Sequence, residues 1–304
     1  MFPPSLGVQL ISLWLLIGCH GTSDPATSED TTKNTQTMPA RTLSIPISGD
    51  PNGLWWDSIA QTLFIADDDG NQILKWTDAD GLSIAGKLPQ ASADGPGLGQ
   101  PVRIADGSLI IPRFGYGTVG DVAILRADGT TQSLSSLDKQ RRRIGLALAE
   151  DGTLYGAYYL RMGRVRSGGV ATLDLFGRET DVITGLRKTV GVLVSDGSLY
   201  VSDQELGQIV KAPLSAPQKT TVFATLETPD LLSAGPQGSL YTGGPQGTVR
   251  QIHADGSVTV FHGGFQQVRG LAWDALSRRL FVANHDADPI DGIHNSIEIV
   301  PVGS

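Results

Sequence analysis

The sequence has little of several features that would narrow its fold and function. Its 304 residues contain one cysteine, Cys19, so the rest of the chain has no thiol that an oxidising compartment would oxidise. No window keeps apolar residues at the i, i+3, i+4 and i+7 positions, which argues against helices. Positive charge is also scarce, because 23 Lys and Arg stand against 31 Asp and Glu, a net charge of −8. Such an acidic chain is not expected to bind nucleic acid.

Two kinds of catalytic motif are missing as well. No glycine-flanked serine stands at a strand-to-helix turn, so the nucleophile elbow of a serine hydrolase is not predicted. No glycine-rich loop joins a strand to a helix, so no nucleotide cradle is predicted either.

What the sequence does contain is a repeated pattern of short apolar runs. In residues 51–76 three such runs alternate with segments rich in Gly, Asn and Asp, which is typical of antiparallel strands joined by tight turns. The second run of the pattern recurs every 40 to 46 residues. Its central leucines are Leu63, Leu109, Leu154, Leu199, Leu240 and Leu280. A repeat of this length with four short strands indicates a propeller blade, and the chain carries six.

The two ends of the repeat region complement each other. The last repeat supplies three strands, at 269–274, 279–284 and 296–302, and an isolated strand pattern at 41–47 precedes the first repeat. We therefore predict an all-β, six-bladed propeller of four-stranded antiparallel blades over 41–304, closed by the N-terminal strand in the last blade. Pro46 suits the outermost position there, because an edge strand lacks a neighbour on one side.

The first forty residues differ in composition from the rest. Residues 1–18 carry no charged side chain and have an apolar centre, which is typical of a signal peptide. This run ends in Leu-Ile-Gly-Cys, which resembles the bacterial lipobox and predicts lipidation of Cys19. Residues 19–40 are rich in Ser and Thr and predict a disordered tether. The expected protein is an exported bacterial lipoprotein at the outer membrane or cell surface; the alternative is a chance apolar leader with an idle thiol.

The repeats also resemble a known superfamily. The segments 51–54, 194–203 and 269–274 resemble the six-bladed propellers of the gluconolactonase/senescence-marker-protein (SGL) superfamily and the related NHL-repeat proteins. The resemblance covers roughly residues 41–304. It implies a site at the face where the first strands start and the second strands end. Propellers host many unrelated functions, so the resemblance specifies the blade better than the activity.

The positions of that face follow from aligning the repeats. The first-strand starts are Asn52, Gln100, Ile144, Val190, Asp230 and Arg269. The second-strand ends are Asp67, Arg113, Tyr158, Asp203, Gly244 and Asn284. Lactonases of the family hold a divalent cation at the first set, so the resemblance makes Asn52, Asp230 and Gln100 the candidate metal ligands. Ile144 and Val190 depart from that pattern. Asn52 and Asp230 are equally consistent with ordinary turn caps.

Positive charge gathers at the entry to the third repeat. Arg141, Arg142 and Arg143 are consecutive, and Arg161, Arg164 and Arg166 follow in the next loop. Guanidinium groups match carboxylate and phosphate, so we predict a basic rim that orients an anionic ligand. The candidate ligand-binding residues are Arg113, Arg141, Arg142, Arg143, Tyr158 and Asn284. The alternative is that these are solvated loop charges.

Two functions remain open at this point. The leading interpretation is a membrane-anchored propeller outside the cytoplasm that binds an anionic small molecule or an envelope protein without catalysis, and it needs no cofactor. The alternative is a metal-dependent lactone or ester hydrolase that uses a divalent cation such as calcium. In that case Asp67 or Asp203 would act as the catalytic base.

Overall fold

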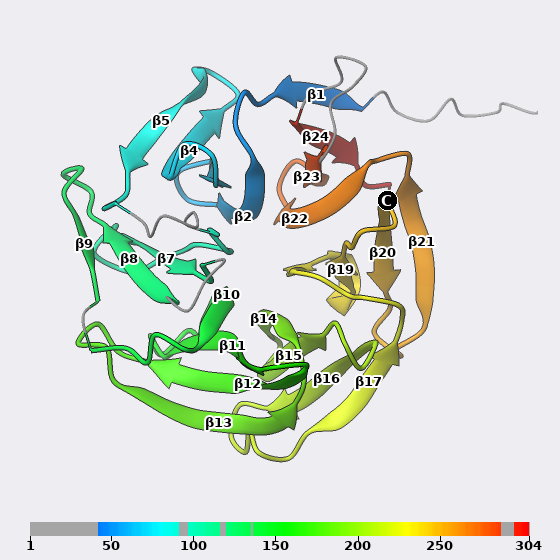
Figure 1. The fold of residues 1–304 in the computed structure, drawn as a ribbon. Helices are drawn as coiled ribbons and strands as arrows, with labels where there is room; N and C mark the ends of the chain where they lie inside the picture. Colours follow the sequence, from blue (N-terminus) through cyan, green and yellow to red (C-terminus); the bar gives the residue numbers. More distant parts are fainter. Residues whose placement is uncertain (1–41, 91–96, 116–119, 135, 287–294, 304) are drawn as a thin grey trace, which may run out of the picture. The chain divides into compact units, whose positions relative to one another are not determined.

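The computed structural model describes residues 42–90, 97–115, 120–134, 136–286 and 295–303. They form six sheets of four antiparallel strands, arranged as blades around a central axis (Figure 1). The predicted six-bladed, all-β propeller is confirmed. The predicted signal peptide 1–18, Cys19 and the tether 19–40 lie outside the described residues. In the part of the chain that is described, no helix has the length and apolar character needed to cross a membrane.

Each blade runs outward from the axis in sequence order. Blade one contains β2 (Pro51–Asp57), β3 (Thr62–Asp67), β4 (Gln72–Thr77) and β5 (Gly81–Lys87). Blade two contains β6 (Val102–Arg103), β7 (Leu109–Arg113), β8 (Asp121–Leu125) and β9 (Thr131–Ser133). Blade three contains β10 (Arg142–Leu148), β11 (Leu154–Met162), β12 (Val165–Leu173) and β13 (Glu179–Leu186).

The remaining blades follow the same order until the last. Blade four contains β14 (Thr189–Ser195), β15 (Ser198–Asp203), β16 (Gln208–Pro213) and β17 (Thr221–Thr225). Blade five contains β18 (Leu232–Ala234), the short 3-10 turn η1 (Pro236–Gly238), β19 (Leu240–Thr242), β20 (Thr248–Ile252) and β21 (Val258–Gly263). Blade six contains β22 (Gln267–Asp274), β23 (Arg279–His285), β24 (Ser296–Pro301) and β1 (Leu43–Pro46).

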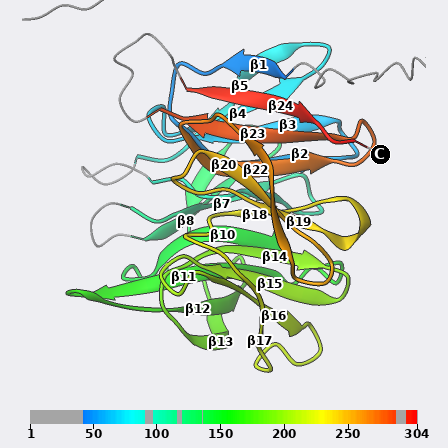
Figure 2. The same ribbon diagram turned by 90° about the vertical axis from the view of Figure 1, so that its right-hand side faces the viewer.

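The N-terminal strand closes the ring as predicted. β1 pairs antiparallel with β24, with Leu43 opposite Ile299 and Pro46 opposite Ser296, and lies at the periphery of blade six (Figures 1 and 2). Pro46 donates no backbone hydrogen bond, and an outermost strand needs none on its free side. Because the first and last strands share one sheet, the ring does not end in an open blade edge.

Apolar side chains between neighbouring blades form the core. One cluster joins blades one and six and includes Leu54, Trp56 and Phe281. The rings of Trp56 and Phe281 lie with their centroids 5.1 Å apart. Burying one such side chain fully stabilises a fold by about 1.5–3 kcal/mol, so these contacts are a large part of what holds the blades together.

The inner strands approach one another so closely that glycine is needed at the ring's centre. A Cβ on Gly270 would stand 2.0 Å from the carbonyl oxygen of Asn52, and one on Gly53 would stand 2.3 Å from the Cα of Gln100. Real side chains do not tolerate such distances. The glycine that follows Asn52 and the glycine that follows Arg269 therefore bring the starts of the inner strands together around the axis.

Candidate functional site

A cavity of about 400 Å³, here called the channel pocket, lies at the starts of the inner strands. All six blades contribute to its wall. Its lining residues are Asn52, Phe114, Arg142, Ile144, Tyr159, Lys188, Val190, Gln204, Thr228, Asp230, Gly244, Pro245, Gln267, Val268 and Arg269. Five of the six first-strand starts aligned from the sequence are in this set; Gln100 is the exception. The channel pocket is large enough for a small-molecule ligand.

Asp230 is the one carboxylate among the described residues that line the channel pocket. Its Oδ1 accepts the backbone N–H of Leu231 at 2.9 Å, and its Oδ2 accepts Nε2 of Gln204 at 3.4 Å. Burial raises the pKa of Asp230 to about 6, and the positive charges of Lys188 and Arg269 limit the rise. A carboxyl with this pKa can take and return a proton near neutral pH.

Lys188 brings an amine to the same wall. Its Nζ donates a hydrogen bond to Oε1 of Gln204, whose amide also reaches Asp230. Gln204 therefore links the two charged groups. Burial lowers the pKa of Lys188, and the neighbouring charges of Arg166 and Arg142 lower it further. The charges of Asp230 and Glu205 act in the opposite direction.

A second set of charges lies beside Asn52. Asp50 contacts Nδ1 of His285 at 2.6 Å and a guanidinium nitrogen of Arg269 at 3.5 Å. Asp68 is buried, and its Oδ1 accepts the backbone N–H of Leu98. Burial raises the pKa of Asp68 to about 7, and the negative charge of Asp50 adds to the rise.

The residues predicted as metal ligands do not fit a divalent centre. Asn52 and Asp230 both line the channel pocket, but Gln100 does not; its Nε2 donates to the carbonyl of Leu232 at 3.4 Å. A hard cation needs several oxygen donors and a net negative site. Asp230 instead lies near two cationic side chains, Lys188 and Arg269, and two of the other strand starts are the apolar Ile144 and Val190. Among the described residues no group of three or more His, Cys, Asp or Glu could hold a metal. The reaction proposed below therefore uses no metal ion.

The two predicted catalytic bases hold loops in place. Asp203 accepts four backbone N–H groups, from Arg187 at 2.7 Å and from Lys188, Glu205 and Leu206 at 3.1 Å each. This carboxylate is thereby used to position the segment that carries Lys188.

Asp67 has a similar set of partners. It accepts the backbone N–H of Asp50 at 3.0 Å and of Gly70 at 3.3 Å, and Nε2 of Gln72 at 2.7 Å. Neither Asp67 nor Asp203 lines the channel pocket.

The three arginines of the predicted basic rim separate in the structure. Arg142 lines the channel pocket. Arg141 forms two hydrogen bonds to Asp181, at 2.6 and 3.1 Å, and lies 4.0 Å over the ring of Tyr158. Arg143 is 1% exposed and pairs with Glu179 at 2.6 and 2.8 Å.

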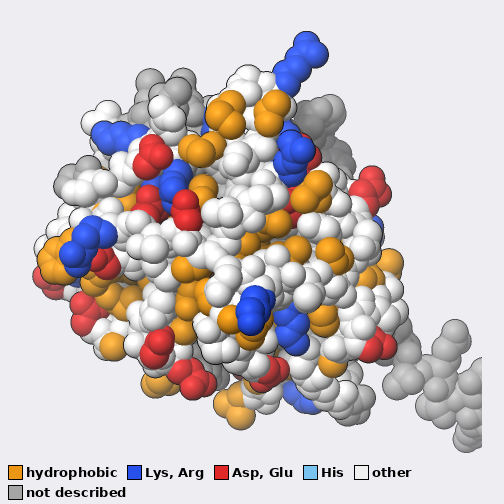
Figure 3. Space-filling view, turned by 90° about the horizontal axis from the view of Figure 1, so that it is seen from below, with side chains coloured by type: hydrophobic (Ala, Val, Ile, Leu, Met, Phe, Trp, Pro, Cys, Tyr) orange, Lys and Arg blue, Asp and Glu red, His pale blue; other side chains and the backbone are white. Residues whose placement is uncertain are grey.

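The other predicted ligand-binding residues also contact the protein itself. Arg113 donates to the carbonyl of Pro89 at 2.8 Å, to Asp121 at 2.7 Å and to Ser133 at 2.6 Å. Asn284 accepts the backbone N–H of Gln266 at 2.8 Å. On the edge of the ring seen in Figure 3, acidic and basic side chains are interspersed. Three cationic side chains line the channel pocket, namely Arg142, Lys188 and Arg269.

Three of the six second-strand ends identified from the sequence are one residue away from a residue that lines the channel pocket, and a fourth, Gly244, lines it directly. The residues just after Arg113, Tyr158 and Asp203 are Phe114, Tyr159 and Gln204, and all three line it. Side chains alternate between the two faces of a strand, so a shift of one residue exchanges a buried contact for an open position. Lys188 also lines the pocket, but it lies two residues before Val190 and belongs to neither aligned set, so the sequence did not identify it.

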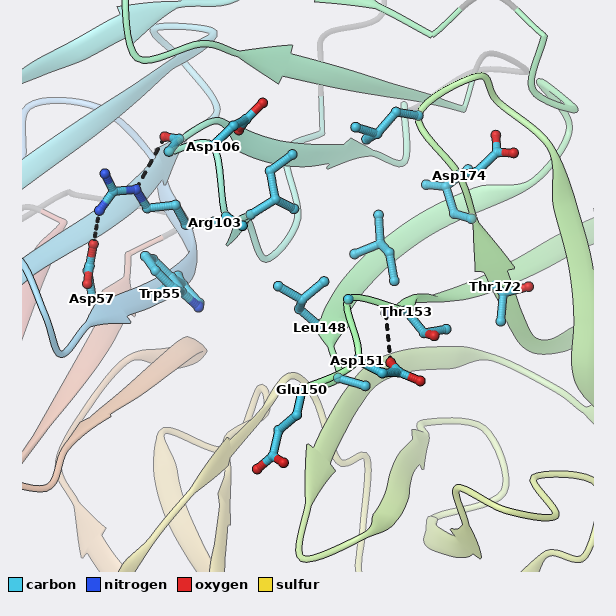
Figure 4. A pocket seen from close by; sticks show the side chains of 18 of the residues that line it. Trp55, Asp57, Arg103, Asp106, Leu148, Glu150, Asp151, Thr153, Thr172 and Asp174 are labelled. Atoms are coloured by element: carbon cyan, nitrogen blue, oxygen red, sulfur yellow. Dashed lines mark hydrogen bonds and ion pairs between the residues drawn. The ribbon is translucent and has the colours of Figure 1, made fainter.

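A larger cavity, of about 1400 Å³, lies at the other end of the inner strands of blades one to three. Its four aspartates each accept a backbone N–H of their own turn; they are Asp57, Asp106, Asp151 and Asp174. Asp57 also pairs with Arg103 of the neighbouring blade, and Asp151 accepts the backbone N–H of Thr153 at 2.9 Å (Figure 4). That hydrogen bond lowers the pKa of Asp151. The channel pocket is the better candidate site, because its titratable groups are the ones poised for proton transfer.

The comparisons with known proteins agree with this architecture. No family model and no curated protein matches the sequence. Solved structures do match. A regucalcin from Agrobacterium tumefaciens, described as a calcium-binding protein, has a TM-score of 0.68 and 16% identity, covering 85% of this chain and 91% of its own. A gluconolactonase from Xanthomonas campestris has a TM-score of 0.67 and 18% identity, covering 86% and 89%. A virginiamycin B lyase from Staphylococcus aureus has a TM-score of 0.59 and 10% identity, covering 86% and 99%. At these identities the likeness shows the fold.

Proposed function

We propose that the protein hydrolyses small lactones or esters that carry an anionic group, in the channel pocket. The observation that carries the proposal is Asp230, a carboxyl with its pKa raised to about 6 that opens onto a pocket also lined by Lys188 and Arg269. The gluconolactonase among the similar structures supports a lactone as the substrate class.

The chemistry follows from these groups. Asp230 accepts a proton from a water molecule, and the resulting hydroxide forms a bond to the carbonyl carbon of the substrate. The positive charges of Lys188 and Arg269 favour the oxyanion that develops, and a third cation, Arg142, attracts the substrate's anionic group. When the tetrahedral intermediate collapses, the bond to the leaving oxygen breaks, and that oxygen takes the proton back from Asp230. An ester gives a carboxylic acid and an alcohol, and a lactone gives one hydroxy acid.

The test is a turnover assay on the full chain with a panel of lactones and aryl esters, with and without a carboxylate on the substrate. We expect hydrolysis that survives a chelator and that falls by about 10²–10⁴-fold in Asp230→Asn. Asp106→Asn, which removes a turn carboxylate beside the larger cavity, is the matched control and should leave the rate unchanged. Activity lost with chelator and restored by calcium would instead support the metal-dependent alternative.

Binding without catalysis is the second candidate. It is favoured by two apolar strand starts, Ile144 and Val190. The family resemblance implies further metal ligands at these positions, and apolar side chains cannot bind a metal. A binding protein would show no turnover in the same panel, but an anionic ligand would raise its unfolding midpoint in a concentration-dependent way. Arg142→Met should abolish that rise.

We also propose that a lipid on Cys19 anchors the propeller to a bacterial membrane. The support is the apolar run 1–18, which ends in the lipobox-like Leu-Ile-Gly-Cys. The full chain expressed in a bacterial host should sediment with the envelope, and Cys19→Ser should release it. Equal fractionation of both proteins would contradict the anchor.

A further inference from the structure

The hydrolysis proposed above uses Lys188 only as a charge, yet its amine is placed for covalent chemistry. Lys188 comes directly before β14 and lines the channel pocket, where a small molecule can reach it. The other lysines of the described chain, at positions 75, 87, 139, 211 and 219, are not among the lining residues. Lys188 is thus the one described lysine inside a candidate binding site.

The contacts of Lys188 hold its nitrogen in place. Its Nζ donates to Oε1 of Gln204, and Gln204 follows β15 directly. The backbone of the same segment is fixed, because the N–H groups of Arg187 and Lys188 both bond to the carboxylate of Asp203. These hydrogen bonds restrict the rotation of the Lys188 side chain. The amine therefore loses little conformational entropy when it reacts with a ligand in the pocket.

Burial disfavours the ammonium form of Lys188, while the negative charges of Asp230 and Glu205 favour it. Lys188 is partly buried, and the guanidinium groups of Arg142 and Arg166 lie close enough to lower its pKa. Arg166 is itself paired with Glu205 at 2.7 Å, which weakens but does not cancel its effect. Desolvation beside other cations is the usual way in which a lysine becomes a nucleophile at neutral pH.

We propose that Lys188 forms an imine with small anionic aldehydes or ketones, such as 2-oxo acids, that enter the channel pocket. Arg142 and Arg269 line the same pocket and match the carboxylate of such a ligand. This activity goes beyond ester hydrolysis, since it needs neither a lactone nor turnover.

The reaction balances with groups that are present. The lone pair of Nζ forms a bond to the carbonyl carbon, and the carbonyl π electrons move to oxygen, which takes up one of the two protons of the amine. The nitrogen then loses its other proton, which is passed to the hydroxyl as the C–O bond breaks and water leaves, so that amine plus carbonyl gives imine plus water. Asp230, which Gln204 links to Lys188, is placed to take the proton from nitrogen and to return it to the departing hydroxyl.

The test traps the imine by reduction. The full chain is incubated with glyoxylate or pyruvate and cyanoborohydride, digested, and mapped by peptide mass spectrometry. Labelling of Lys188 should saturate with the probe and exceed that of the exposed Lys75, since a lysine whose pKa is lowered has more free amine at neutral pH. Propanal, which lacks the carboxylate, should label Lys188 less.

Variants separate this reaction from nonspecific labelling. Lys188→Met should lose the saturable label, and Lys188→Arg, which keeps the charge, should lose it too. Lys75→Met should leave the label on Lys188 unchanged. Unfolding midpoints of each variant check that the propeller is intact. Labelling of Lys188 no faster than that of Lys75 would overturn the proposal, and so would labelling unaffected by the carboxylate. Trapping without ester turnover would leave this inference standing while the hydrolase proposal fails, and the reverse result would do the opposite.

Discussion

Replacing Asp68 by Asn should stabilise the propeller at neutral and alkaline pH. Asp68 is 5% exposed, and burial raises its pKa from 3.8 to about 7, with the charge of Asp50 adding to the rise. Asn at this position keeps an oxygen for the backbone N–H of Leu98. The substitution therefore removes a buried charge without removing the contact that holds the loop.

The sign and size of the effect follow from proton linkage. Between pH 3.8 and about 7 the folded chain keeps a proton on Asp68 that the unfolded chain has released. Stability therefore falls as pH rises through this window, by up to about 1.4 kcal/mol per pH unit. Above pH ~8 the buried charge costs about 2–4 kcal/mol, which Asp68→Asn should recover. Below about pH 4 the two proteins should be equally stable.

The measurement is urea unfolding of the full chain, followed by tryptophan fluorescence at several pH values from 4 to 8.5. The difference in the free energy of unfolding between Asp68→Asn and the parent should grow with pH. Because the other carboxyls are the same in both proteins, this difference reports on Asp68 alone. Asp69→Asn changes the exposed neighbour of Asp68 and should leave stability unchanged at every pH. A stability difference that is the same at acid and alkaline pH would refute the reasoning, as would a variant that is less stable at pH 8.5.

Three further predictions concern packing, pairing and catalysis. Gly270→Ala should destabilise the propeller by about 3 kcal/mol in denaturant unfolding, because its Cβ would overlap the carbonyl of Asn52, whereas Gly263→Ala has ordinary space and should not. Arg143→Met should cost about 3–5 kcal/mol, because it leaves Glu179 without its buried partner; an equally stable variant would contradict that role. Any hydrolase activity should rise with pH through about 6, as Asp230 loses its proton; a pH-independent rate from 5 to 8 would exclude Asp230 as the base.

Much of the fold was readable from local patterns. Turn residues and apolar runs repeat about every 40 residues. Within a repeat, each strand pairs with the next strand in the sequence, so the local pattern is enough to predict the blade. The closure was also predictable, because the last repeat lacked one strand and the segment 41–47 supplied it. The starts of the first strands could be aligned because the repeat is regular, and that alignment identified Asn52 and Asp230, which both line the channel pocket.

The direction of individual side chains was decided by the tertiary structure. Asp203 and Asp67 stand at aligned strand ends, yet their carboxylates bind backbone N–H groups of adjacent loops, and the residue after Asp203 faces the pocket. A strand turns alternate side chains to opposite faces, so an alignment error of one residue reverses the prediction.

The electrostatics of the site depend on contacts between distant segments. Arg143 pairs with Glu179 on the outer strand β13, so a run of three arginines leaves one of them, Arg142, on the channel pocket. Asp230 and Lys188 come from different blades and meet through Gln204. Their altered pKa values come from burial inside the closed ring. The repeat determines that six blades form, but the distance between these charges and their removal from water exist only once the ring has closed.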